Sequence, residues 1–83
     1  MHKFIVERSF SSPFTDRNLS DVGERMAPCL ELHDVRWIRS HLSEDRLRMI
    51  CEYDARDAES VRKVQHESGA NFDRVWVGQL IEP

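Results

Sequence analysis

The chain has 83 residues, of which 40% are hydrophobic and 33% charged, which is the composition of a globular domain and not of a disordered segment. We expect residues 1–83 to form one domain. The formal net charge of −3 argues against a nucleic-acid partner, because a phosphate backbone requires a basic surface. No apolar run is long enough to cross a bilayer, and only Cys29 and Cys51 are cysteines. We therefore expect no membrane span, no signal peptide and a cytoplasmic location.

The first half of the chain predicts a strand followed by a helix. Alternating apolar and polar side chains from Lys3 to Phe10 are typical of a strand. The polar residues 11–18 are predicted to form a loop. Ser20 is predicted to cap a helix, because acidic residues follow in what would be its first turn. Pro28 cannot donate a backbone hydrogen bond, so we expect this helix to kink or to be shortened there.

The second half predicts three strands and another helix. The strands are predicted at residues 35–42, 47–53 and 73–80. A polar turn at 43–46 joins the first two, and the helix is predicted to begin after Asp57 and to end at Gly69. The resulting order is strand, helix, strand, strand, helix, strand. This order predicts an α+β ferredoxin-like sandwich, with a four-stranded antiparallel sheet and two helices on one face.

The two faces of the predicted sheet differ in polarity. With a two- or four-residue turn, the opposing pairs on one face are Leu42 and Leu47, Ser40 and Met49, and Ile38 and Cys51. This nearly apolar face is expected beneath the helices. The other face mixes apolar and charged side chains, namely Ile5, Glu7, Trp37, Arg39, His41, Arg48, Ile50, Glu52 and Trp76. Its apolar members would form an exposed patch, so we predict a homodimer that pairs through this face.

Four segments resemble a bacterial family of small single-domain proteins of unknown function that is known through a nickel-binding member. They are residues 4–10, 37–45, 51–54 and 58–63, and the resemblance extends over nearly the whole chain. The resemblance implies a ferredoxin-like protomer and a face-to-face dimer. It also implies binding of nickel or another divalent transition metal.

The best candidate metal ligands in the sequence are His41, Glu7 and Glu52. Imidazole and carboxylate groups suit nickel, zinc or copper, and the strand assignment places all three residues on one face. The same residues could instead form a salt-bridge network with Arg39 and Arg48, because no spacing typical of a closed metal site is present. We expect a binding protein and not an enzyme, with the ligands shared between subunits.

A second interpretation is a small-molecule-binding protein or enzyme resembling the dimeric α/β-barrel group. In that group a cleft between the sheet and the helices holds an organic ligand. Trp37 and Trp76 would form its walls here, and Arg39 would position His41 or Glu7 as a general base. The two tryptophans could equally form the apolar centre of a dimer interface. A third possibility is a dimer that acts only as an interaction module.

Overall fold

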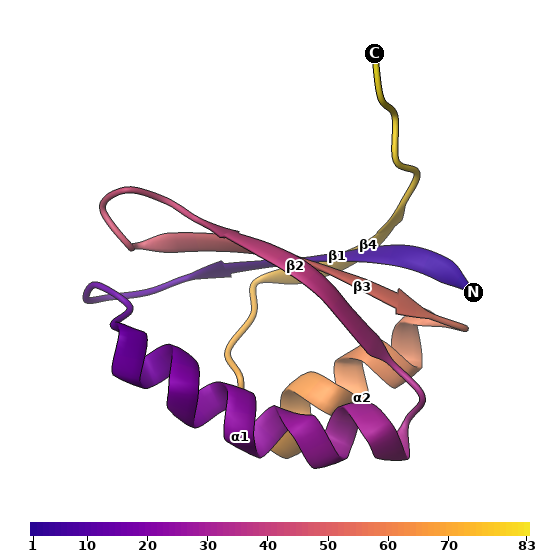
Figure 1. Ribbon diagram of the computed structural model, residues 1–83, viewed down its shortest axis with the longest axis horizontal. Helices are drawn as coiled ribbons and strands as arrows, with labels where there is room; N and C mark the ends of the chain where they lie inside the picture. The colour runs from indigo at the N-terminus through magenta and orange to yellow at the C-terminus, as the bar shows by residue number, and fades with distance from the viewer.

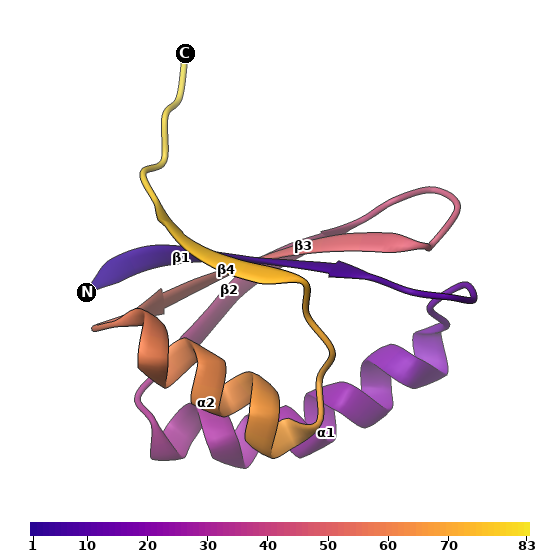
Figure 2. The same cartoon turned by 180° about the vertical axis from the view of Figure 1, so that it is seen from behind.

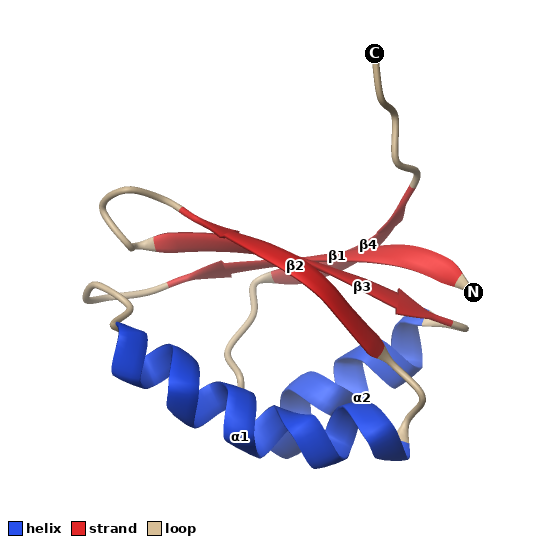
Figure 3. Ribbon diagram, viewed as in Figure 1, coloured by secondary structure: helices blue, strands red, loops and turns tan.

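The computed structural model describes residues 1–83 and confirms the predicted element order and fold class. The strands are β1 (His2–Ser9), β2 (Arg36–Leu42), β3 (Arg48–Ala55) and β4 (Arg74–Gly78), and the helices are α1 (Asp16–Leu32) and α2 (Ala58–Ser68). The strands pair antiparallel in the order β2-β3-β1-β4. Both helices cover the same face of the sheet, which gives a two-layer α+β sandwich (Figures 1 and 3). Neither helix is long and apolar enough to cross a membrane.

The core lies between the helices and the two central strands. Alternate residues of β1 and β3 are buried there, because successive side chains of a strand point to opposite faces. Met26 of α1 and Val61 and Val64 of α2 close the core from the helix side. Seen from behind, α2 lies beneath β4 and the C-terminal residues extend away from the sheet (Figure 2).

Helix α1 begins earlier than the sequence predicts. Thr15 is its cap: the Thr15 hydroxyl accepts from the Asn18 backbone at 3.0 Å, and the Asn18 side chain accepts from the Thr15 backbone at 2.9 Å. This reciprocal box satisfies two backbone donors at once. The predicted cap at Ser20 and the predicted loop to residue 18 are therefore wrong, since the helix starts at Asp16.

The helix also continues through Pro28 to Leu32, so the predicted shortening is wrong. Proline removes one hydrogen bond to the preceding turn. Packing on both sides of it offsets this loss. Met26 is buried before Pro28, and Leu30 packs against the core after it. Pro28 itself is exposed, so its ring displaces no core side chain.

Both predicted ends of α2 are confirmed. The Asp57 carboxylate accepts a 2.8 Å hydrogen bond from the Ser60 backbone, and this bond holds the pKa of Asp57 below its usual value. Gly69 adopts a left-handed conformation with φ of 72° at the other end. Such a conformation is free of strain for glycine, which is why a glycine ends the helix here.

The register of the β2–β3 hairpin differs from the predicted one by two residues. Leu42 lies opposite Met49, and Ser40 lies opposite Cys51. The predicted partner of Leu42, Leu47, instead accepts a backbone hydrogen bond from Phe10 in the segment after β1. From Arg39 to Leu42, a shift by two leaves each side chain on its predicted face, because the period of a strand is also two.

Candidate functional site

The sheet face turned away from the helices, which we call the open face, carries most of the predicted site. Two rows of side chains cross it: Arg39, Glu52, Ile5 and Trp76 form the first, and His41, Ile50, Glu7 and Arg74 form the second. Ile50 and Trp76 are each 45% exposed. The predicted mixture of apolar and charged groups on one face is therefore present in the protomer.

Both predicted acidic ligands are held by neighbouring side chains. Oε2 of Glu7 accepts a 2.6 Å hydrogen bond from the Trp76 indole and lies 3.2 Å from Nε of Arg74. Oε2 of Glu52 lies 3.2 Å from Nε of Arg39. The alternative interpretation of these residues as a salt-bridge network is thus present in part, although Arg48 forms none of these pairs.

His41 is exposed on β2, and its imidazole forms no hydrogen bond or ion pair within the chain. In the sheet, Ile50 lies between His41 and Glu7. The backbones of His41 and Glu7 are therefore two strand spacings, about 10 Å, apart. A hollow of about 440 Å³ is lined by both His41 and Glu7, but Glu52 is not among its lining residues. No group of three or more His, Cys, Asp or Glu side chains is close enough to hold a metal ion. One protomer alone therefore does not fit a transition metal.

Trp37 lies on the opposite side of the sheet from the predicted one. Trp37 lies opposite Tyr53, and Arg39 lies opposite Glu52, the neighbour of Tyr53 in β3. Ile38 is therefore an extra residue in β2 and forms a β-bulge. The Trp37 indole donates to Ser40 at 2.8 Å and lines a pocket beneath α1. The structure therefore separates Trp37 from Arg39 and Trp76, and the three do not line one cleft.

The remaining histidines and the cysteines are dispersed. His33 forms a 2.9 Å pair with Glu67, whereas His66 packs edge-on against Phe72. Cys51 is buried in the core and Cys29 is half-buried on α1. None of these groups joins His41 on the open face.

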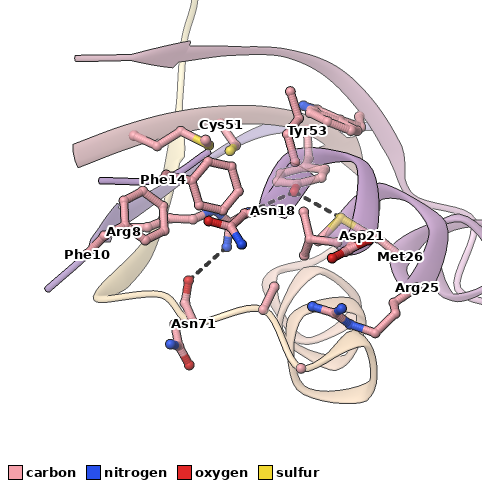
Figure 4. Close-up of a pocket in the computed structure, with 16 residues that line it drawn as sticks. Arg8, Phe10, Phe14, Asn18, Asp21, Arg25, Met26, Cys51, Tyr53 and Asn71 are labelled. Atoms are coloured by element: carbon pink, nitrogen blue, oxygen red, sulfur yellow. Dashed lines mark hydrogen bonds between the residues drawn. The ribbon is translucent and has the colours of Figure 1, made fainter. Parts of the chain in front are cut away.

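A pocket of about 210 Å³ lies between α1 and the sheet (Figure 4), and of the three residues predicted for a cleft between sheet and helices only Trp37 lines it. At its base the buried Arg8 side chain donates to Gln65 at 2.9 Å, to the Asn71 carbonyl at 3.0 Å and to the Tyr53 hydroxyl at 3.0 Å. Burial raises the pKa of Tyr53 to about 12. The sequence feature that indicates this pocket is Arg8, which lies on the same strand face as Phe4 and Val6, where a charged side chain is unexpected.

Comparison with known proteins identifies a family and a similar solved structure. A family model described as "Nickel responsive protein SCO4226-like" matches residues 4–77. The crystal structure of SCO4226 from Streptomyces coelicolor A3(2) is similar with a TM-score of 0.84 and 15% sequence identity, over 96% of this chain and 99% of that one. At this identity the likeness concerns the fold alone. No curated protein matches the chain.

Proposed function

Since the chain belongs to the SCO4226-like family of nickel responsive proteins, we propose that it is a homodimeric metal-binding protein without catalytic activity. The proposed metal is nickel or a similar divalent transition metal. The proposed ligands are His41, Glu7 and Glu52, contributed by both protomers. The family match over residues 4–77 is the observation that carries the proposal.

The chemistry of the open face supports these ligands. The His41 imidazole is exposed and unpaired, and it borders the same hollow as Glu7. Imidazole and carboxylate donors suit nickel and zinc. Because one protomer brings too few of them together, a second copy is needed to complete the ligand set.

Pairing of two open faces is supported by their exposed apolar side chains. Ile50 and Trp76 lie on the sheet face that no helix covers, and charged residues surround them. An apolar centre with a polar rim is the usual anatomy of a protein interface. The two free cysteines support a cytoplasmic location for this dimer, because thiols stay reduced there.

The alternative, a small-molecule site or enzyme in a cleft between the sheet and the helices, has weaker support. Its predicted walls were Trp37 and Trp76, with Arg39 positioning the general base. Trp37 lines the pocket on the helix-covered side, whereas Arg39 and Trp76 lie on the open face, so these residues do not enclose one cleft.

The experiment is a calorimetric titration of untagged, chelator-stripped protein with nickel and zinc. We expect a dissociation constant below about 1 µM and an integral number of ions per dimer. His41→Ala should weaken binding at least about tenfold, which corresponds to about 1.4 kcal/mol. His66→Ala is the matched control, because His66 is exposed at the end of α2 and far from the open face.

Two results would count against the proposal. Unchanged affinity in His41→Ala removes His41 as a ligand. Wild-type binding no tighter than about 1 mM would refute metal binding as the function of this protein.

A further inference from the structure

The pocket between α1 and the sheet lies on the opposite side of the sheet from the proposed metal ligands. Its apolar lining comes from both layers and includes Met26 of α1, Met49 and Tyr53 of β3, Trp37, and the rings of Phe10 and Phe14. Phe10 and Phe14 stack with ring centroids 4.5 Å apart and form one wall. The volume of about 210 Å³ is below the roughly 300–1,000 Å³ of pockets for drug-sized ligands, so the pocket suits a smaller molecule.

Arg8 gives this apolar pocket a buried positive charge. The residue is 7% exposed, and its guanidinium group pairs with none of the carboxylates of the chain. Its three hydrogen bonds go to neutral oxygen atoms of Gln65, Asn71 and Tyr53, as the dashed lines of Figure 4 show for the last two. A guanidinium group has five N–H donors, so further donors remain available.

A buried charge without a counter-charge is costly, and buried charges in proteins are usually paired. Tyr53 does not supply the negative charge, because its raised pKa keeps it a neutral phenol at physiological pH. The other charged lining residues are Asp21 and Arg25 of α1, both exposed, and they offset each other. The net charge of the lining is therefore positive, and its positive centre is at Arg8.

We propose that this pocket binds a small organic anion, a carboxylate on an aromatic or compact apolar body, and that Arg8 holds the carboxylate. The body would lie against the stacked rings of Phe10 and Phe14, because planar aromatic groups favour such surfaces. Arginine recognises carboxylates through paired, charge-assisted hydrogen bonds. This site is independent of the proposed metal site, which belongs to the other face of the sheet.

The test compares phenylacetate with phenylacetamide, which has nearly the same shape but no charge. Trp37 lines the pocket and serves as the fluorescent reporter in a Trp76→Phe background, with a chelator present to exclude metal. We expect saturable binding of phenylacetate and at least about tenfold weaker binding of phenylacetamide, as expected for a hydrogen bond to a charged group. Arg8→Met should abolish this preference. Arg39→Met should preserve it, because Arg39 lies on the open face.

Equal binding of the two probes would overturn the proposal, and so would a preference that persists in Arg8→Met. If Arg8→Met does not fold, the comparison of phenylacetate with phenylacetamide on the Trp76→Phe protein still tests whether the pocket prefers the anion. Failure of phenylacetate, benzoate and hexanoate alike to give a saturable change would also overturn it. None of these outcomes bears on nickel binding, because the chelator removes the metal from this experiment.

Discussion

The Trp76 indole donates a 2.6 Å hydrogen bond to Oε2 of Glu7, across the boundary between β4 and β1. Arg74 lies 3.2 Å from the same oxygen atom. A metal ion that takes Glu7 as a ligand must therefore compete with a guanidinium group and an indole N–H. This competition makes the contribution of Glu7 measurable.

Arg74→Gln should tighten nickel binding if Glu7 is a ligand, because it removes the competing charge. Exposed ion pairs contribute about 0.2–1 kcal/mol, so we expect an increase in affinity of up to about fivefold. Calorimetry on stripped protein measures the change. Arg62→Gln is the control, since Arg62 is exposed on α2 and forms no ion pair. An affinity that stays the same in both variants would remove Glu7 from the ligand set.

Ile50→Lys should convert the proposed homodimer into a monomer. Ile50 lies between His41 and Glu7 near the middle of the open face, and burying an ammonium group in an apolar contact is costly. Analytical ultracentrifugation should give twice 9.8 kDa for the wild type and 9.8 kDa for the variant. Leu32→Lys at the end of α1 should remain dimeric, because Leu32 is 73% exposed and away from the sheet. A monomeric wild type would refute the proposed dimer.

Tyr53→Phe should lower the free energy of unfolding by about 1–3 kcal/mol, because it leaves a buried N–H of Arg8 without an acceptor. Chemical denaturation at neutral pH measures this change. A variant as stable as the wild type would mean that water or another side chain replaces the phenol.

The same substitution should alter the alkaline limb of the stability profile. The folded pKa of Tyr53 is about 12, above the ordinary value of 10.0, because burial disfavours the phenolate. The unfolded chain therefore releases this proton first. The stabilisation is complete below pH 10.0 and is lost as the pH rises toward about 12. The difference in stability between the wild type and Tyr53→Phe should shrink across this window. If the difference in stability between the wild type and Tyr53→Phe stays constant with pH, Tyr53 does not have the raised pKa.

Pro28→Ala should stabilise the protein. It restores a donor to the interior of α1 at an exposed position, where a proline costs up to about 3 kcal/mol, although proline recovers about 0.4–1 kcal/mol by restricting the unfolded chain. Thermal denaturation measures the gain. Pro13→Ala is the control, because Pro13 lies in a loop and loses only the unfolded-state benefit. A loss of stability in Pro28→Ala would show that the helix depends on the proline.

Local sequence signals predicted much of the fold. The cap at Asp57 and the glycine at position 69 are properties of a few neighbouring residues, and both are confirmed. The start of α1 was missed because Ser20 and Thr15 are both plausible caps. The choice between them depends on the reciprocal bond with Asn18, which the sequence alone did not single out.

The element order and the face of nearly every strand residue follow from local sequence patterns, because a period of two survives even a two-residue error in register. The bulge at Ile38, which turns Trp37 to the helix side, depends on tertiary packing. So do the charges that pair with Glu7 and Glu52, and the position of Arg8 without a carboxylate in an apolar pocket. These features depend on residues far apart in the chain, such as Glu7 with Trp76 and Arg8 with Tyr53. Their contacts arise only when the strands and helices pack together.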